Sequence, residues 1–209
     1  MARSYDQHCH YELSRIWSII SYDRDVKAVV LRGHAGVLGG GSTPELMANV
    51  STDWSALMDT YQETRDIVMG VIECSKPVVA AIEGSTVGGV LAAALVSDIS
   101  VAGNGAKIFD PHTLIGVVAG DGGAIIWPLL CGMARTKFHL LTGEPLNGRR
   151  AAEIGLVSEA VDDADVVARE MGLARKVASL PAVGIRWTKH SLNGWLRMAT
   201  PMFDHSPAA

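Results

Sequence analysis

The sequence predicts an α/β fold in which helices alternate with parallel strands. The first observation is a short apolar run, residues 77–82, which follows Lys76 and is typical of a strand buried on both faces. The second is a glycine turn, Gly88-Gly89, that opens residues 90–96, a segment apolar on every side and typical of a buried helix. A strand, a glycine turn and a helix start together leave free backbone N–H groups, which favour binding of a negatively charged ligand atom.

The part of the chain before this stretch predicts two helices, one strand and one loop. Residues 6–20 carry apolar side chains at helical spacing, and residues 53–73 do the same over a longer stretch. Residues 26–31 (VKAVVL) are typical of a strand. Residues 33–45 contain three consecutive glycines and are expected to form a loop.

The part after it continues the alternation of strands and helices. We expect strands over residues 99–102, 108–109 and 156–160, and helices over residues 124–130, 136–141, 148–153, 166–180 and 183–195. This alternation favours an α/β fold with parallel pairing.

Composition excludes several classes of protein. A chain of 209 residues with 48% apolar residues can bury one sizeable core. Its net charge of −4, without a concentrated basic segment, argues against a nucleic-acid partner. The longest apolar run, residues 87–96, is too short to cross a bilayer. The three cysteines show no metal-binding spacing, so we expect reduced thiols in a cytoplasmic protein that has no metal site.

Several motifs follow one another in a characteristic order. They are KPVVAAIEGSTVGG, SDISVAG, AKIFDPHTLIG, AGDGG and LLTGEPLNGRRAAEIGLVSEAV. Over residues 10–190 they resemble the enoyl-CoA hydratase/isomerase family, also called the crotonase family. The resemblance implies a spiral of ββα turns over residues 1–160 and a C-terminal helical segment over residues 161–209. Relative to that family we expect a chain shortened at both ends, since an Asn-Arg-Pro segment and the last helices are missing.

The same resemblance implies the partners of the chain. We expect an acyl-CoA or related carbonyl substrate, with coenzyme A as part of the substrate and no separate cofactor. We also expect a role in fatty acid metabolism and a homotrimer or a dimer of trimers.

The resemblance assigns an oxyanion hole to two glycine turns. Gly89 and Gly40 align with the two backbone N–H donors that stabilise negative charge on a thioester oxygen. The aspartate that the family usually has after the first donor is replaced by Thr43. The alternative is that these glycines only make tight turns. We further expect three neighbouring residues to contact substrate, and these are His34, Gly88 and Gly120.

The acid and base of the family's hydratases are both replaced in this chain. Hydratases of the family use two glutamates, and the aligned positions are Ala92 and His112. Asp121 follows His112 by nine residues, so we expect it to orient the imidazole, which would act as a general base. The alternative is that His112 caps a turn and Asp121 caps the next helix.

Three hypotheses about function follow. The family default is hydration or isomerisation of an enoyl-CoA, the first of which is a lyase reaction. The His112–Asp121 pair resembles the β-diketone hydrolase branch of the family, which favours retro-Claisen C–C cleavage or thioester hydrolysis. The third hypothesis is a truncated remnant without catalytic activity.

Overall fold

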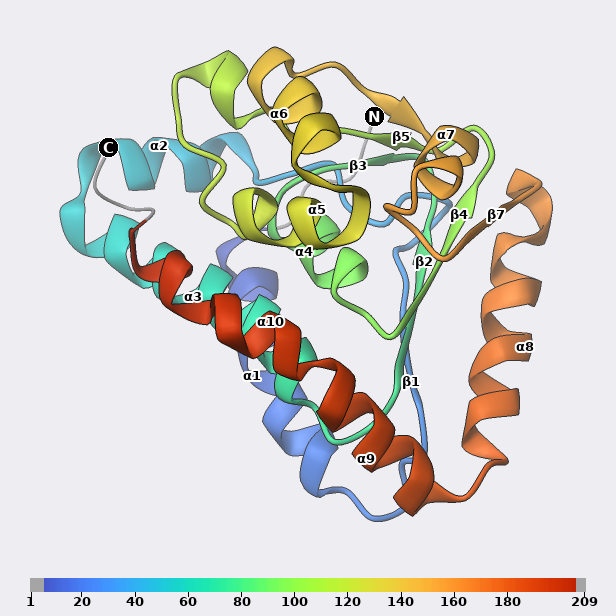
Figure 1. Cartoon of the computed structure of the whole chain (residues 1–209). Helices are drawn as coiled ribbons and strands as arrows, with labels where there is room; N and C mark the ends of the chain where they lie inside the picture. The colour runs from blue at the N-terminus through green and yellow to red at the C-terminus, as the bar shows by residue number, and fades with distance from the viewer. Residues whose placement is uncertain (1–5, 206–209) are drawn as a thin grey trace.

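The main sheet has four parallel strands. A computed structural model of the chain describes residues 6–205 (Figure 1). The strands are β1 (Val29–Leu31), β2 (Val78–Ile82), β4 (Ile99–Gly103) and β7 (Glu159–Val161), in the order β1-β2-β4-β7. Every neighbouring pair is parallel, which confirms the predicted α/β class.

A second, smaller sheet lies beside the first. Its strands are β3 (Ser85–Thr86), β5 (Lys107–Ile108) and β6 (Leu146–Asn147), in the order β3-β5-β6. The pair β3–β5 is parallel and the pair β5–β6 is antiparallel. Of these three strands the sequence predicted only β5, as residues 108–109, because its apolar pair stands out. Strands β3 and β6 have two residues each and no such local signal.

Helices cover both faces of the main sheet. They are α1 (Gln7–Tyr22), α2 (Pro44–Thr52), α3 (Trp54–Glu73), α4 (Gly88–Leu95), α5 (Gly123–Cys131), α6 (Met133–Thr142), α7 (Gly148–Glu153), α8 (Val166–Ala178), α9 (Ala182–Leu192) and α10 (Gly194–Ala199). Three short 3-10 helices complete the described chain, η1 (His112–Ile115), η2 (Asp163–Asp165) and η3 (Thr200–His205). Figure 1 shows α8 on one side of the sheet, with the other helices gathered on the opposite side.

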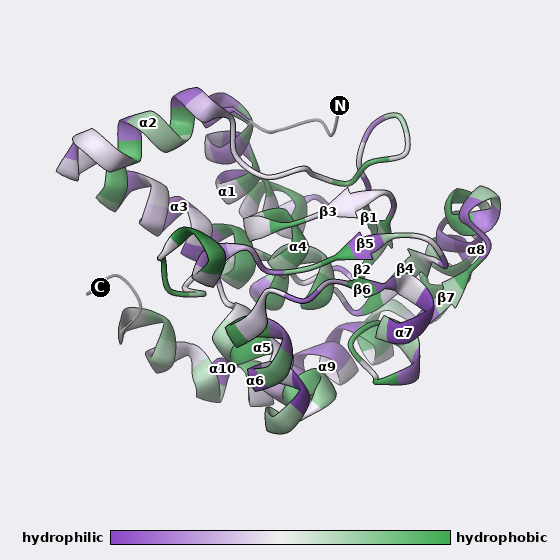
Figure 2. Cartoon of the chain, turned by 90° about the horizontal axis from the view of Figure 1, so that it is seen from above, coloured by the Kyte–Doolittle hydropathy of each residue, from purple (hydrophilic) through white to green (hydrophobic). Residues whose placement is uncertain are grey.

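The alternation of side chains along β2 divides the core between α4 and α8. Val78, Ala80 and Ile82 belong to the large cluster that includes α4, whereas Ala81 packs with Val166 of α8. In Figure 2, seen from above, α4 lies in the middle of the fold and is mostly hydrophobic. Burial of nearly every residue of α4 confirms the prediction of a helix buried on all sides.

One carboxyl group is buried on the inner face of α8. Glu170 is fully buried, and neither of its carboxyl oxygens has a hydrogen-bond partner among the described residues. Burial raises the pKa of Glu170 to about 7; the positive charge of Arg32 lowers it and the negative charge of Glu83 raises it further.

Buried polar contacts fix the C-terminal helices to the sheet and to α3. The Lys189 ammonium of α9 lies 2.8 Å from the Asp98 carboxylate, and it donates to the Val71 and Lys76 carbonyls. Asn193 lies between α9 and α10 and donates to the carbonyl of Ile72. Residues 183–195, predicted as one helix, are therefore divided at Asn193.

Two further differences from the sequence prediction have local causes. Helix α2 begins inside the segment expected to be a loop, because Thr43 caps it and Pro44 occupies its first turn. The final strand is residues 159–161 instead of 156–160, since Leu156 donates to the Ala151 carbonyl at the end of α7.

Cys74 and Cys131 are buried free thiols, and Cys9 is an exposed one. Over residues 6–205, every helix is too short or too polar to cross a lipid bilayer.

Candidate functional site

Three extended segments lie side by side and bring the predicted site residues to one edge. Gly39 forms an isolated parallel bridge with Thr86, and Thr86 pairs in parallel with Ile108. Because all three segments run in the same direction, their continuations leave the pairing at the same edge. Those continuations carry Gly40, the Gly88-Gly89 turn and His112.

The start of α4 provides backbone donors at this edge. Val87 is the N-cap residue of α4 and makes no side-chain cap, so the first N–H groups of the helix lack the usual side-chain acceptor. Gly88 has a φ angle of 73°, a left-handed conformation that favours glycine. The Val87 N–H donates to the Gly39 carbonyl at 3.1 Å, which holds the two glycine turns together. The geometry is compatible with an oxyanion hole from Gly40 and Gly89.

His112 begins η1 and is held by the carboxylate of Asp110. The Nδ1 atom of His112 lies 2.7 Å from Asp110 Oδ1, and the backbone N–H of His112 donates to the same oxygen at 2.9 Å. Asp110 is buried, and the side chain of His112 is 20% exposed. Thr113 donates to the Leu140 carbonyl and thereby attaches this turn to α6. The second ring nitrogen of His112 is therefore the one left for chemistry.

Asp121 completes a cluster with Asp110 and His112. One ligand-type atom from each residue lies within 4.8 Å of the corresponding atoms of the other two. Asp121 also accepts a hydrogen bond from the Gly123 N–H at the start of α5, at 3.3 Å. The pKa of Asp121 is raised above its usual value, mainly because the carboxyl group is buried. The positive charge of His112 opposes this increase, and the negative charge of Asp110 adds to it.

The two carboxylates decide the protonation state of the imidazole. Burial by itself lowers the pKa of His112, but the hydrogen bond to Asp110 and the charges of Asp121 and Asp110 raise it to about 9. At neutral pH, His112 is therefore an imidazolium, with both ring nitrogens protonated. This state favours proton donation, whereas the sequence predicted a general base.

The sequence predicted the wrong hydrogen-bond partner for His112. Asp110, and not Asp121, binds Nδ1, because Pro111 has a helical conformation at the start of η1 and the Asp110 carboxylate accepts from the His112 N–H two residues later, beside the ring. Asp121 is close enough to act through its charge. The missed signal was an aspartate directly before Pro-His, since aspartate side chains often bond to the backbone two residues later. The alternative interpretation, in which Asp121 binds the start of α5, agrees with its hydrogen bond from the Gly123 N–H.

The same cluster offers one nitrogen and two carboxylates to a metal ion. Asp110, His112 and Asp121 are the only described residues that meet the geometry for three such ligands. However, the 2.7 Å contact between His112 Nδ1 and Asp110 Oδ1 places a proton between these two atoms. The geometry therefore fits an acid–base group better than a metal site.

A cavity of about 390 Å³ lies beside the two glycine turns. Its walls include Gly39, next to Gly40, and Val90, next to Gly89. His34 also lines it, at the position where the sequence predicted a substrate contact. A volume of this size is within the range of small-molecule sites.

Two further positions complete the description of the predicted site. Gly120 lies in the loop between His112 and Asp121, and its N–H donates to the Val118 carbonyl at 2.7 Å. Ala92, which replaces a family glutamate, is buried in α4.

Comparison with known proteins decides the family. A profile described as "Enoyl-CoA hydratase/isomerase" matches residues 2–203. The chain belongs to this family. A crystal structure of an enoyl-CoA hydratase/isomerase from Mycobacterium paratuberculosis superposes with a TM-score of 0.92 at 32% identity, covering 97% of this chain and 81% of that one. The crotonase fold predicted from the motifs is thereby confirmed.

Curated relatives are more distant and longer. A probable enoyl-CoA hydratase of Bacillus subtilis is 29% identical over 170 residues, which are 80% of this chain and 65% of that protein. The (E)-benzylidenesuccinyl-CoA hydratase of Thauera aromatica is 28% identical over 188 residues, covering 90% of this chain and 73% of that protein. The chain thus spans about two thirds to three quarters of the length of these two relatives.

Proposed function

We propose that this protein binds an acyl-CoA thioester and catalyses proton transfer at the carbon next to its carbonyl group, as in hydration or isomerisation of an enoyl-CoA. The observation that carries this proposal is the bridge between Gly39 and Thr86, which brings the two glycine turns together. The N–H groups of Gly40 and Gly89 would stabilise the enolate oxygen. Such donors contribute several kcal/mol to transition-state stabilisation.

His112 would supply the proton in this reaction. Because Asp110 holds Nδ1, the Nε2–H of the imidazolium is the group that would protonate the α-carbon of the enolate. In hydration, water adds its hydroxyl to the β-carbon, and the carboxylate of Asp121 would accept the other proton of that water. Asp121 would then return this proton to His112, which restores both groups for the next turnover. Asp121 would thus replace the base that Ala92 does not provide.

Hydrolysis is less well supported than hydration or isomerisation. A retro-Claisen or thioester hydrolase needs a neutral imidazole to activate water. With a pKa of about 9, roughly 1% of His112 is neutral at pH 7. We further propose that coenzyme A enters only as part of the substrate and that the reaction needs no metal ion.

The test is product analysis on purified protein with a short enoyl-CoA and, in parallel, a cyclic 1,3-diketone. We expect loss of the conjugated enoyl thioester, and the same rate after treatment with EDTA. His112→Ala should lower kcat by about 10²- to 10⁴-fold, the usual contribution of a general acid or base. The matched control is His8→Ala, since His8 is an exposed histidine on α1.

Three outcomes would contradict the proposal. Equal turnover by the wild type and by His112→Ala would exclude the role of His112. Cleavage of the diketone without any change in the enoyl-CoA would return the assignment to hydrolysis, and inactivity on both substrates would favour a non-catalytic chain.

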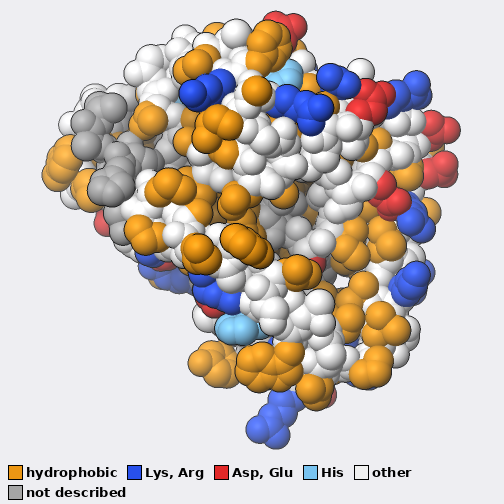
Figure 3. Space-filling view, in the orientation of Figure 1, with side chains coloured by type: hydrophobic (Ala, Val, Ile, Leu, Met, Phe, Trp, Pro, Cys, Tyr) orange, Lys and Arg blue, Asp and Glu red, His pale blue; other side chains and the backbone are white. Residues whose placement is uncertain are grey.

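We also propose that the protein self-associates as a trimer or a dimer of trimers in the cytoplasm. Exposed apolar side chains gather on η1 and α6, among them Leu114, Ile115, Phe138 and Leu141. Figure 3 shows hydrophobic side chains on the surface in this region, next to Lys and Arg side chains. The three free thiols fit a reducing compartment.

A further inference from the structure

A second and larger cavity lies at the opposite end of the main sheet from the candidate active site. Its volume is about 830 Å³, and its walls include Val26 and Pro77, which precede β1 and β2. The candidate active site follows the carboxyl ends of the same strands. The two cavities share none of their lining residues. One cavity lies at the amino ends of the parallel strands and the other at their carboxyl ends, so they are separate sites.

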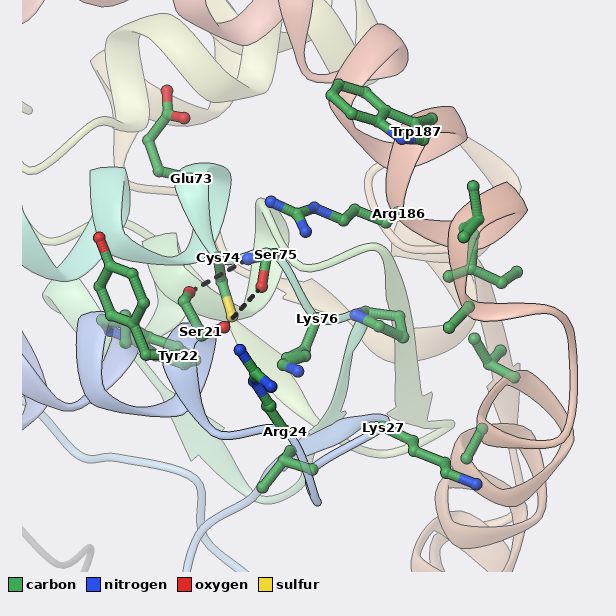
Figure 4. Close-up of a pocket in the computed structure, with 18 of the residues that line it drawn as sticks. Ser21, Tyr22, Arg24, Lys27, Glu73, Cys74, Ser75, Lys76, Arg186 and Trp187 are labelled. Carbon is green, nitrogen blue, oxygen red and sulfur yellow. Dashed lines mark hydrogen bonds between the residues drawn. The ribbon is translucent and has the colours of Figure 1, made fainter.

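Positive side chains from three segments surround this cavity. Arg24 precedes β1, Lys76 precedes β2 and Arg186 belongs to α9. Figure 4 shows their head groups around the same part of the cavity, near Ser75. Over residues 6–205, no carboxylate forms an ion pair with any of the three. The single acidic residue among the lining residues is Glu73, which faces Arg197 at 3.8 Å.

The start of α9 adds to the positive potential. Ala182 and Val183, in the first turn of this eleven-residue helix, line the cavity. Pro181 is the N-cap residue and makes no side-chain hydrogen bond to the helix start. The free N–H groups and the helix dipole therefore favour an anion at the same place as the three cations.

Two tryptophans give the cavity an aromatic component. Trp187 is 56% exposed and lies at the cavity beside Arg186, whose guanidinium is 5.7 Å from the indole centroid. Trp17 is 3% exposed and lines the cavity, and its indole N–H has no hydrogen-bond partner among the described residues.

We propose that this cavity binds a nucleoside diphosphate. Three unpaired cations and a helix start suit a ligand with several negative charges, which a diphosphate has and a fatty acid does not. The exposed face of Trp187 suits stacking of a flat base. The apolar walls would receive the remaining body of the nucleoside. The volume is within the range of ligand sites in proteins.

The test is calorimetric titration of the whole chain with ADP. We expect saturable binding to one site, which weakens as salt is added because the attraction is electrostatic. Lys76→Glu and Arg186→Glu should each weaken binding by at least about tenfold, equivalent to about 1.4 kcal/mol. The thermal unfolding temperature of each variant shows whether the substitution has damaged the fold. Because Lys76 and Arg186 lie on different segments, weaker binding in both variants is not explained by damage to one segment.

Two controls make the result specific. Arg149→Glu reverses an exposed arginine of α7 outside the cavity and should leave ADP affinity unchanged. His34→Glu alters the other cavity and should also leave it unchanged, which separates this site from binding of the ADP portion of coenzyme A near Gly39. Absence of saturable binding overturns the proposal. Weakening by His34→Glu but not by Lys76→Glu or Arg186→Glu also overturns it.

Discussion

Replacement of Asp110 by asparagine should lower the pKa of His112 and change the pH dependence of the proposed reaction. The Oδ1 atom of Asp110 contacts both the Nδ1 atom and the backbone N–H of His112, at 2.7 and 2.9 Å. Asparagine has the same shape and retains an acceptor oxygen, but it carries no charge. The substitution therefore removes the electrostatic part of this contact and keeps the turn.

The magnitude follows from the strength of a hydrogen bond between charged groups. Such a bond contributes roughly 1.5–3 kcal/mol, and one pKa unit corresponds to about 1.4 kcal/mol. The pKa of His112, about 9 in the wild type, should therefore fall by roughly one to two units in Asp110→Asn. The negative charge of Asp121 remains and keeps the pKa above that of an exposed histidine.

The direct assay is an NMR titration of the histidine rings. The sequence has seven histidines, and the resonance that is lost in His112→Gln identifies the relevant one. A second assay is the pH profile of kcat/KM, whose decrease at alkaline pH should move from about 9 to roughly 7–8 if the imidazolium is the acid. An activity that increases through pH 9 would indicate a base instead. An unchanged titration of His112 in Asp110→Asn would refute the assignment of Asp110 as its partner.

Stability provides an independent check with a defined sign. The folded pKa of His112 lies above the value of about 6.5 in the unfolded chain, so its stabilisation is complete below pH 6.5. The stabilisation is then lost as pH rises from about 6.5 to about 9. Urea unfolding of the wild type should show this decrease, and Asp110→Asn should show a smaller one over the same interval.

Two further predictions concern the buried carboxyl and the assembly. Glu170 has a folded pKa of about 7, above its unfolded value, so the free energy of unfolding should fall by on the order of 3 kcal/mol between about pH 4.5 and 7. Glu170→Gln should lack this decrease in urea titrations, and an equal decrease in both proteins would contradict the reasoning. Light scattering should give a mass of three or six chains of 22.2 kDa, and Phe138→Asp with Leu141→Asp should reduce it. A monomer in the wild type would exclude self-association through η1 and α6.

The sequence by itself determined the fold class and the positions of the main elements. A segment that is apolar on every side has to be buried wherever it lies, so β2 and α4 were predictable from local composition. The ordered motifs around Gly89 and His112 were equally informative about the family. Helix α2 also had a local signal, Thr43 followed by Pro44, which the run of glycines obscured.

Only the tertiary structure decided how the site residues meet. The bridge between Gly39 and Thr86 joins segments that are far apart in the chain, and no local pattern encodes such a pairing. The choice of Asp110 over Asp121 depended on how Pro111 turns the chain, and the protonation of His112 depended on both carboxylates lying near one ring.

The cavity at the amino ends of the strands also could not be predicted from local sequence. Arg24, Lys76 and Arg186 are scattered in the sequence, where each is typical of an exposed charged residue. They converge because the parallel strands begin at one end of the sheet and Lys189 fixes α9 beside that end. Local propensities determine individual elements, but electrostatic sites depend on distances between elements, and packing alone sets those distances.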